Sequence, residues 1–407
     1  MSLSKLTIKS IPLEHKTVLV RADYNVPLNA KGEIDDDLRI RASIPTIRYL
    51  LSQHCKVVII SHLGRPEGRD ASQSLAPVAQ RLQELLGQSV TFIEDCIGDK
   101  VKHGVRKAAQ TSVTLLENLR YYTAEEENSE AFAKEIAQAT GARYFVQDGF
   151  GVIHRAHAST DAITHFIPSV AGLLLEKEFN TITAAMENPK RPLVAVLGGA
   201  KVSDKITVIE RFVSVADRII IGGAMANTFL SYRGHSVGAS KVEADQGEVL
   251  TRIYDAARQK VGDAVDDFII LPADVAVAKQ ISPDAERTMV PVSDIAADDI
   301  ALDIGDQTII RMIKEILPAK TVIWNGTLGY AEIPAYAHGS ARLALSLATQ
   351  TGTTSIVGGG DTADFVLKWD GQQGESFTHV STGGGASLEL MAGKVLPGIA
   401  SLLDAQK

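Results

Sequence analysis

Five segments in the first 160 residues carry arginine or histidine, most of them just after a short apolar run. They are RADYNVPL (21–28), DDDLRIRASIPTI (35–47), SHLGRP (61–66), ENLRYY (117–122) and QDGFGVIHRAHAST (147–160). A guanidinium group can bind a carboxylate or a phosphate through two parallel hydrogen bonds. One surface arginine is usually a solvated charge, but five such segments together favour a pocket for a small anion.

The candidate ligands in these segments are polar or charged side chains: Asp23, Asn25, Arg39, Arg41, His62, Arg65, Arg120, His154, Arg155 and His157. The histidines could instead be capping or core groups, and we expect His157 to be structural.

The second half of the chain has glycine clusters in place of these arginines. They are LGGAK (197–201), IGGAMANTF (221–229), VGGGDTADF (357–365) and STGGGASLE (381–389). Glycine lets a ligand approach the backbone, and a helix N-terminus offers free N–H groups to an anion. One such cluster is more often a plain turn, but four at strand ends favour phosphate and nucleotide binding. The chain lacks both the G-x-x-x-x-G-K-[ST] loop and a G-x-G-x-x-G opening a helix after a strand.

Three charged residues lie beside these glycines. Lys201 and Lys205 are close to the expected start of a helix, where the macrodipole favours anions rather than lysine. Their unfavourable position beside two glycines favours phosphate binding. The alternative is that both are ordinary solvated lysines. Asp361 in GGGDT is either a helix N-cap or a ligand of Mg²⁺, which takes one or two carboxylates and fills its shell with phosphate and water.

Short, fully apolar runs alternate with helical patterns along the whole chain. Such runs are typical of parallel strands buried on both faces. The sequence therefore predicts an α/β protein with two doubly wound, Rossmann-like parallel sheets. The expected strands are 17–20, 56–60, 90–93, 113–115, 143–146, 193–197, 218–221, 267–271, 321–324, 354–357 and 378–380, and expected helices include 75–86, 129–140, 306–317 and 340–349.

Length also favours two domains, since 407 residues exceed one ordinary core. SVAGLLLEKEFNTITAAM (169–186) predicts a connecting helix, stopped by Asn188 and Pro189. We expect domains at 1–170 and 171–398, with the helix counted in the second.

Composition narrows the class of protein. The net charge is −8, which argues against a nucleic-acid coat. Residues 1–170 hold 20 basic and 20 acidic residues, whereas the rest hold 21 and 29, so an anion site is easier to place in the first half. Two cysteines and no apolar leader or span suit a cytoplasmic protein without a membrane segment.

These motifs, in this order, resemble the phosphoglycerate kinase family over essentially the full length. The matching segments are RADYNVPL, DDDLRIRASIPTI, SHLGRP, LLENLR, GFGVIHRAHAS, LGGAKVSDKI, GGAMANTF, WNGTLGYAE, GGGDT and STGGGASLELMAGKVLPGI. The resemblance implies a monomeric phosphotransferase of glycolysis and gluconeogenesis. It would move a phosphoryl group between 1,3-bisphosphoglycerate and ADP, giving 3-phosphoglycerate and ATP.

The resemblance also implies roles for individual residues. In the N-terminal domain, 3-phosphoglycerate would be bound by Asp23, Tyr24, Asn25, Arg39, His62, Leu63, Gly64, Arg65, Arg120 and Arg155. In the C-terminal domain, the Mg-nucleotide would be bound by Lys205, Glu332, Gly359, Gly360, Asp361 and Thr362, with Asp361 on the metal. Arg39, Lys201, Gly384 and Gly385 would act on the transferred group, and the tail at about 399–407 would pack on the N-terminal domain.

The resemblance also implies a mechanism without a general base, because both possible nucleophiles are already ionised. Catalysis would rest on positioning, charge stabilisation and closure of the domains about the connecting helix. Departures from the family pattern are Gly149 and Ile153 in DGFGVIHR, Thr327 in WNGTLGYAE and Asp306 in LDIGD. They bear on loop rigidity and kinetics.

Three alternatives stay open at this point. A Mg-dependent kinase for another small acid would keep the glycine loops but need a different anion set. A nucleotide-binding sensor would be favoured by loss of Lys201, Asp361 or Arg39, all of which are present. A dehydrogenase is disfavoured because RADYN replaces the glycine motif after the first strand.

Overall fold

The structure, a computed structural model, describes residues 3–371 and 374–405. The chain divides into two compact units, Met1–Thr181 with Lys394–Lys407, and Ile182–Gly393. The first boundary falls within a helix rather than at 170, because the first turns of that helix bond to groups of the first unit. The second falls at 393 rather than 398, because the Gly398 amide donates to the Ile153 carbonyl at 2.9 Å.

The first unit is built on a six-stranded parallel sheet in the order β3-β4-β2-β1-β5-β6. Its strands are short, and all but the edge strand β3 are almost wholly buried, as the apolar runs predicted. They are β1 (Thr17–Arg21), β2 (Lys56–Ile60), β3 (Val90–Ile93), β4 (Val113–Leu116), β5 (Tyr144–Gln147) and β6 (Ser169–Ala171).

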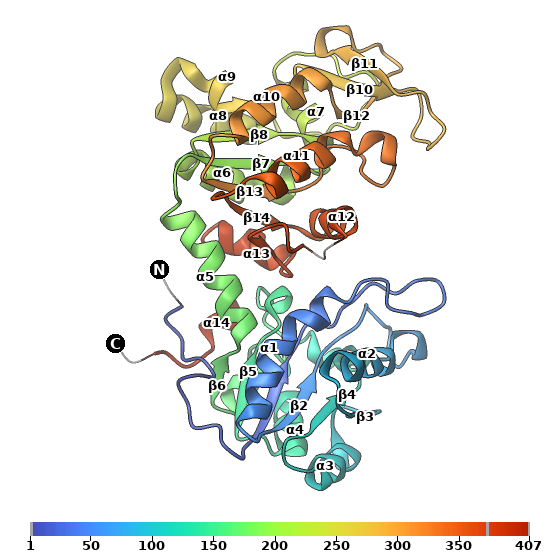
Figure 1. Cartoon of the computed structure of the whole chain (residues 1–407), viewed down its shortest axis with the longest axis vertical. Coiled ribbons are helices and arrows are strands. Elements are labelled where there is room, and N and C mark those ends of the chain that lie inside the picture. The colour runs from blue at the N-terminus through green and yellow to red at the C-terminus, as the bar shows by residue number, and fades with distance from the viewer. Residues whose placement is uncertain (1–2, 372–373, 406–407) are drawn as a thin grey trace. The chain divides into compact units, whose positions relative to one another are not determined.

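Helices cover both faces of this sheet (Figure 1). On one face lie α1 (Leu38–Ser52) and α2 (Ala76–Leu86), whose apolar residues share a core with Val18, Val20 and Ile59. On the other lie α3 (Gly98–Lys107) and α4 (Glu130–Thr140), packed with Leu19 and Val58. Successive strand residues thus face opposite cores, as in a doubly wound sheet.

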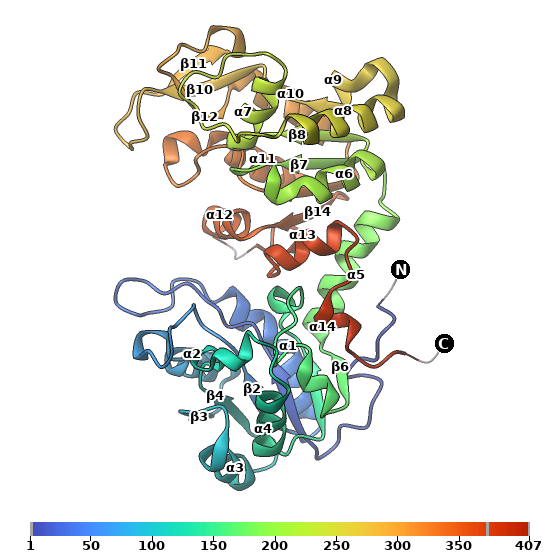
Figure 2. The ribbon, with the colours of Figure 1, turned by 180° about the vertical axis from the view of Figure 1, so that it is seen from behind.

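The described N-terminal and C-terminal segments both belong to the first unit (Figure 2). After α14 (Pro397–Ala400), the Leu403 amide donates to Ser169 at 3.0 Å and its carbonyl accepts from Leu6 at 2.8 Å. The predicted tail at 399–407 is described as far as Ala405, and residues 406–407 lie outside the described part.

The connecting helix is shorter than predicted. It is α5 (Leu173–Glu187), not 169–186. Residues 169–171 form β6 instead, where Phe145, Val146 and Gln147 of β5 pair with them. The short apolar run SVA is compatible with a strand as well as with the start of a helix. Pairing with β5 makes it a strand.

The second unit is built on another six-stranded parallel sheet, in the order β15-β14-β13-β7-β8-β9. With the first sheet, it confirms the predicted α/β class with two doubly wound parallel sheets. Its strands are β7 (Leu193–Leu197), β8 (Arg218–Ile221), β9 (Ile269–Ile270), β13 (Thr321–Asn325), β14 (Thr354–Gly358) and β15 (His379–Val380).

One face of this sheet packs on α10 (Asp306–Ile316), α11 (His338–Thr349) and α12 (Gly360–Asp370), around the buried Trp324. The remaining helices of the unit are α6 (Ile206–Val215), α7 (Gly223–Tyr232), α8 (Gly247–Val261), α9 (Val265–Phe268) and α13 (Gly385–Met391).

A three-stranded antiparallel sheet in the second unit was not predicted. It pairs β10 (Asp274–Ala278) with β11 (Thr288–Pro291) and β12 (Ile300–Ile304). β11 is partly or fully exposed along its length, and a register shift interrupts the β10–β12 pairing. TMVP of β11 and IALDI of β12 are not the fully apolar, buried runs that mark a central parallel strand.

Candidate active site

The anion-binding candidates of the first unit follow four strands that are neighbours in the sheet. These strands are β4, β2, β1 and β5, and all are parallel. Their carboxyl ends therefore meet at one edge. Residues 22–25, 61–65, 117–120 and 148–155 lie just beyond it. The topology brings together segments that are more than 100 residues apart in sequence.

Hydrogen bonds tie three of these loops to one another. The Asn118 Oδ1 accepts from the amides of Leu63 (3.2 Å) and Arg120 (3.0 Å). The Gly64 amide donates to Asn25 Oδ1 at 2.8 Å, and Arg120 Nη1 donates to the Gly64 carbonyl at 2.7 Å. The loops after β1, β2 and β4 therefore form one bonded assembly, and Arg120 is held within it.

Arg39 reaches this edge from the start of α1. Its Nη1 lies 2.8 Å from Oδ2 of the buried Asp23, whose Oδ1 accepts from the Asn25 amide at 3.2 Å. The structure places the side chain of Tyr24 away from this edge. Its hydroxyl is 2.8 Å from Ser43 Oγ inside the core, so only its backbone lies at the edge.

His62 is buried and electrically neutral. Arg21 Nη2 lies 3.2 Å from its Nδ1. A guanidinium can only donate, so Nδ1 accepts and the ring proton is on Nε2. Burial first, and then the charges of Arg21, Arg120 and Arg39, hold the pKa of His62 well below its usual range. The ring therefore presents a fixed N–H donor without a charge.

The support beneath His62 was missed in the sequence. Arg21 and Glu125 are both fully buried, 3.8 Å apart, and Ser159 bonds to each of them. Burial raises the pKa of Glu125, against the opposing charge of Arg21. The one available signal was an arginine ending the otherwise apolar strand TVLVR.

Positive charge accumulates around Arg120. The pKa of Arg120 is lowered first by burial, with Arg155 and Arg65 adding to the effect and Glu126 opposing it. His157, expected to be structural, is buried, and its pKa is lowered to about 4 by burial and by Arg21 and Arg120. Arg39, Arg65, Arg120 and Arg155 are therefore within electrostatic range of one group of buried residues.

Arg41 does not join this group. Its Nε donates to Asp37 one turn earlier at 2.6 Å, and Arg81 binds the same carboxylate at 2.8 Å. Arg41 therefore forms an ion pair with Asp37 outside the anion-binding group.

In the second unit the glycine clusters meet at the corresponding edge. Gly198, Gly222, Gly326, Gly359 and Gly384 follow β7, β8, β13, β14 and β15. The structure separates them into two kinds. A Cβ on Gly198 would lie 2.0 Å from the Thr327 carbonyl oxygen, and one on Gly223 would lie 2.6 Å from the Gly199 nitrogen. These glycines let neighbouring loops pack closely on each other. This agrees with the interpretation of a glycine cluster as a plain turn.

Other glycines face open space. A Cβ on Gly360 or Gly384 would have no neighbour within 4 Å. Gly360 opens α12 and Gly384 is the residue before α13. Free helix N–H groups at these positions are accessible to an anion. Gly359 has φ +94°, a conformation that favours glycine.

Lys205 is nearly buried beneath the loops. Its Nζ donates to the Gly198 carbonyl at 2.6 Å and to the Asn325 carbonyl at 3.0 Å. Burial lowers its pKa to about 8, while Asp361 and Asp204 oppose the shift. Lys201, four residues earlier, is exposed.

Asp361 is not a helix N-cap. Gly359 is the N-cap of α12 and no side chain caps that helix, while Asp361 is exposed in its first turn. Thr362 is buried and accepts from the Gly326 amide at 2.7 Å. Glu332 is exposed in the segment after β13.

No group of three metal-ligating side chains occurs among the described residues. Asp361 can still serve as the single carboxylate that a phosphate-bound Mg²⁺ needs.

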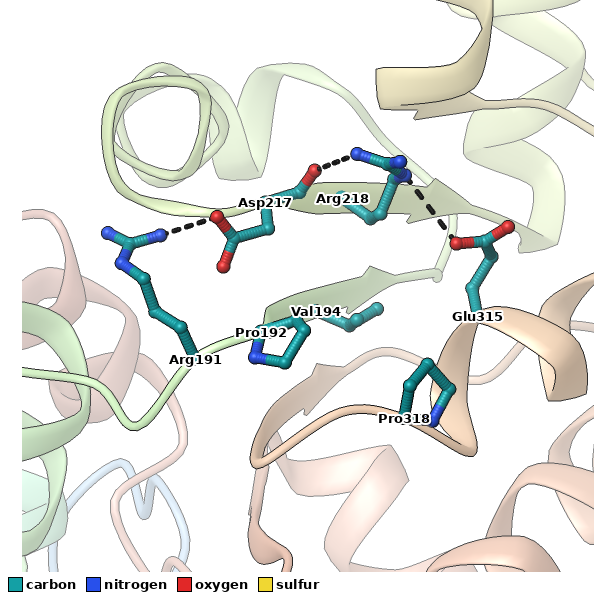
Figure 3. A pocket seen from close by; sticks show the side chains of 7 residues that line it. All are labelled: Arg191, Pro192, Val194, Asp217, Arg218, Glu315 and Pro318. Carbon is teal, nitrogen blue, oxygen red and sulfur yellow. Dashed lines mark hydrogen bonds and ion pairs between the residues drawn. The ribbon is translucent and has the colours of Figure 1, made fainter.

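A cavity of about 370 Å³ in the second unit lies away from this edge (Figure 3). Pro192 and Arg218 place it at the amino ends of β7 and β8. Its arginines are paired, Arg191 with Asp217 at 2.6 Å and Arg218 with Glu315 at 3.5 Å. It therefore offers no net charge to an anion.

Within the described residues, no helix is both long and apolar enough to cross a membrane.

Comparison with known proteins assigns the family. The family model for phosphoglycerate kinase matches residues 8–394. The chain belongs to the phosphoglycerate kinase family. It is 45% identical over 399 residues to the phosphoglycerate kinase of Dictyoglomus turgidum, covering 98% of each chain. It is 47% identical over 410 residues to that of Acaryochloris marina, covering 99% of this chain and 100% of the relative.

A solved structure of phosphoglycerate kinase from Coxiella burnetii has the same fold. It matches with a TM-score of 0.83 at 36% identity, covering 98% of both chains.

The departures from the phosphoglycerate kinase pattern have local physical accounts. A Cβ on Gly149 would lie 3.1 Å from the backbone of Ala22 and Asp23, so glycine relieves a tight contact. Ile153 is fully buried and its Cβ lies 3.1 Å from the Cβ position of Gly398 in the C-terminal segment. Asp306 opens α10, where an acidic residue suits the helix dipole as well as proline suits the first turn.

Thr327 contributes through its backbone. Its carbonyl accepts from the Gly199 amide at 2.9 Å. A carbonyl acceptor does not depend on the side chain, so this loop contact is available to threonine and proline alike.

Proposed function

We propose that this chain catalyses reversible, Mg²⁺-dependent phosphoryl transfer between 1,3-bisphosphoglycerate and ADP, giving 3-phosphoglycerate and ATP. The observation that carries the proposal is the convergence of Arg39, Arg120, Arg155 and neutral His62 at one sheet edge. That edge suits a small substrate with a phosphate and a carboxylate. Membership of the phosphoglycerate kinase family supports the same reaction.

In the first unit, we assign the arginines to the anionic groups of 3-phosphoglycerate. Arg120 is oriented by Gly64, and Arg39 by Asp23, so both present planar donors at low entropic cost. Asn25 and His62 would contact the hydroxyl and carboxyl groups. The backbone of Tyr24, Leu63 and Gly64 and the more exposed Arg65 and Arg155 complete the assigned site.

In the second unit, we assign Gly359, Gly360, Thr362 and Lys205 to the phosphates of the nucleotide and Glu332 to its ribose. Asp361 would hold Mg²⁺, which neutralises phosphate charge when bound. The donors of this site are mainly backbone N–H groups at the start of α12.

The reaction needs no general base, because the attacking carboxylate or phosphate oxygen is already ionised. The chain's task is then to orient two substrates and to stabilise charge on the transferred group. We assign this stabilisation to Lys201, Arg39, Gly384 and Gly385. We expect the two units to close about α5, so that the substrates meet and water is excluded.

A coupled assay of purified protein tests the reaction. We expect ATP-dependent formation of 1,3-bisphosphoglycerate from 3-phosphoglycerate, lost when Mg²⁺ is chelated. A panel of other small phosphorylated and unphosphorylated acids separates this substrate from alternatives. Activity only with a different acid would assign the chain another kinase reaction.

Lys201→Ala tests the role of the lysine. We expect kcat to fall by roughly 10²–10³-fold with little change in nucleotide affinity, because the charge acts on the transition state. Weaker nucleotide binding at an unchanged kcat would contradict that role.

We further propose a cytoplasmic monomer that binds neither nucleic acid nor membrane. Two free, buried cysteines suit a reducing compartment. Light scattering of the purified protein at micromolar concentration checks the monomer, and a dimer mass would exclude it.

A further inference from the structure

The carboxylate of Glu243 binds the backbone directly after Lys201. Its Oε2 accepts from the Val202 amide at 2.7 Å and from the Ser203 amide at 3.1 Å. Its Oε1 accepts from the Ser203 hydroxyl. Glu243 lies about 40 residues further along the chain, in the segment between α7 and α8 (Figure 1). One side chain thus satisfies two free amides at the start of the η6 turn (Ser203–Lys205) that leads into α6.

These bonds complete a two-sided attachment of the loop that carries Lys201. On the side of β7, the Gly199 amide donates to Thr327 and its carbonyl accepts from Met225, both at 2.9 Å. On the other side, Val202 is fully buried and is bonded to Glu243. Only Ala200 and Lys201 lie between the two attachment points.

Lys201 itself has little else to fix its direction. Its side chain is exposed, and among the described residues it makes no hydrogen bond or close ion pair, although its charge acts on Glu243. The preceding Gly198 and Gly199 add no side-chain contacts, and Gly199 has φ +92°. The direction of the Lys201 Cα–Cβ bond therefore depends on the backbone that Glu243 holds.

Glu243 is itself held from behind. Its amide donates to Oγ1 of the buried Thr228 on α7 at 3.1 Å. Asn227 on the same helix donates to the Lys241 carbonyl at 3.4 Å. Burial alone would raise the pKa of Glu243, but its bonds to Ser203 and Val202 and the charge of Lys201 lower it. The carboxylate is therefore ionised at neutral pH.

We propose that Glu243 is a positioning residue for phosphoryl transfer, which orients Lys201 by holding the amides of Val202 and Ser203. The proposal rests on the proposed kinase function. Glu243 does not touch the substrates and acts only through Lys201. The alternative is that Glu243 competes with the nucleotide. In that case its carboxylate occupies the position of a phosphate and must leave when the nucleotide binds. The two arrangements make opposite predictions for nucleotide affinity.

Asp274 provides a matched control. It accepts from the amides of Gln307 (3.0 Å) and Thr308 (2.8 Å) and from the Thr308 hydroxyl (2.6 Å) at the start of α10. The pattern of two amides and one hydroxyl is the same as that of Glu243, but no lysine assigned to chemistry precedes it. Loss of either carboxylate should destabilise the second unit to a similar extent.

The experiment compares Glu243→Ala, Glu243→Gln and Asp274→Ala in the full-length protein, by steady-state kinetics with Mg-ATP and 3-phosphoglycerate and by thermal unfolding. For Glu243→Ala we expect kcat to fall by roughly 10- to 100-fold with the KM for Mg-ATP within about threefold of wild type. Glu243→Gln keeps an oxygen acceptor and should recover most of kcat. Asp274→Ala should lower the unfolding temperature but leave kcat within about twofold.

Combining Glu243→Ala with Lys201→Ala sharpens the test. Because Glu243 acts through Lys201, the double variant should be no slower than Lys201→Ala alone. Fully additive losses overturn the proposal, as does a kcat effect matched by Asp274→Ala. Tighter Mg-ATP binding by Glu243→Ala would instead show a competing anion. An inactive wild-type protein would refute the kinase function itself, which separates that failure from failure of the inference.

Discussion

The two parallel sheets bring loops together at their carboxyl edges, but the groups that we propose to bind ligand differ between the two edges. At the edge of the first sheet the groups are side chains, held by buried partners such as Asp23 for Arg39 and Arg21 for His62. At the edge of the second they are mostly backbone groups exposed by glycine, with Lys205 as a partly buried cation beneath them. A small acid with few atoms needs convergent charges, whereas a polyphosphate can be bound along a helix N-terminus.

This difference predicts that the two edges fail in different ways. The first should be sensitive to loss of charge and the second to added side-chain volume. The largest effect should come from Gly198→Ala, since the new Cβ would lie 2.0 Å from the Thr327 oxygen and 2.7 Å from the Gly326 oxygen. Backbone cannot move away as a flexible side chain can. We expect a loss of more than about 4 kcal/mol in the unfolding free energy, measured by urea denaturation.

Gly360→Ala is the matched control, because its Cβ would meet nothing within 4 Å. It should unfold at the same urea concentration or slightly higher, since alanine is favoured in helices by about 0.5–1 kcal/mol. Its affinity for Mg-ADP should nevertheless fall if phosphates approach this turn. Equal stability of the two variants would show that glycine packing does not build the second edge.

The next largest effect concerns charge at the first edge. Arg39→Ala removes a donor from the site and leaves the buried Asp23 without its ion pair. We expect kcat/KM for 3-phosphoglycerate to fall about 100-fold, and Arg39→Lys to recover only part of it, because an ammonium group lacks the planar fork. Arg41→Ala is the control two residues away, bonded to Asp37 outside the cluster. A similar loss in both variants would indicate a general effect of positive charge on α1.

The fold could be predicted from sequence wherever a strand was buried on both faces. Runs such as KVVII and LVAVL are short, apolar and rich in β-branched residues, as is typical of strands in the middle of a parallel sheet. Prediction failed where pairing, not composition, decided the state. Residues 169–171 became β6 through β5, and β10–β12 form an antiparallel sheet with a partly exposed strand.

The sequence predicted which loops meet at each sheet edge, but not which residues support them. Arginines after strands predicted the first edge, since parallel strands share a carboxyl end. Glu125, Ser159 and Asn118 act through contacts with residues distant in sequence, and no local pattern marks them. Glu243 is the same case at the second edge.

A pH profile of nucleotide affinity tests the role of Lys205, the cation beneath the loops of the second edge. The pKa of Lys205 is lowered to about 8, from 10.5, mainly by burial. Between these values the unfolded chain binds more protons, so the free protein should gain stability as the pH rises through this window. Bound phosphates favour the charged ammonium. Affinity for Mg-ADP should therefore fall above pH 8, by up to about tenfold per pH unit.

Titration calorimetry between pH 7 and 9.5 measures this slope, and Lys205→Met provides the comparison. The variant should bind Mg-ADP weakly with little pH dependence. A wild-type affinity that is constant across this range would mean that Lys205 is not the group that responds to phosphate.

The smallest effect concerns a carboxylate at the first edge that lies apart from the arginines. Asp148 follows β5, and its Oδ1 accepts from Thr46 (2.9 Å) and from the Leu174 amide of α5 (3.0 Å). Its Oδ2 is buried without a partner, and burial raises its pKa to about 7 from 3.8. The folded chain therefore binds more protons between these values, and stability should decline as the pH rises from about 4 to 7.

Asp148→Asn keeps the Oδ1 acceptor but cannot ionise. We expect it to be more stable than wild type at pH 8 by about 1 kcal/mol, with the difference vanishing near pH 4, as measured by urea unfolding at both values. A variant that is less stable by the same amount at both pH values would contradict this. It would show that the hydrogen-bonding geometry of the carboxylate stabilises the fold and that its ionisation does not destabilise it. Since the arginine cluster is untouched, 3-phosphoglycerate affinity should change little, which would separate the charge that orders α5 from the charges that bind substrate.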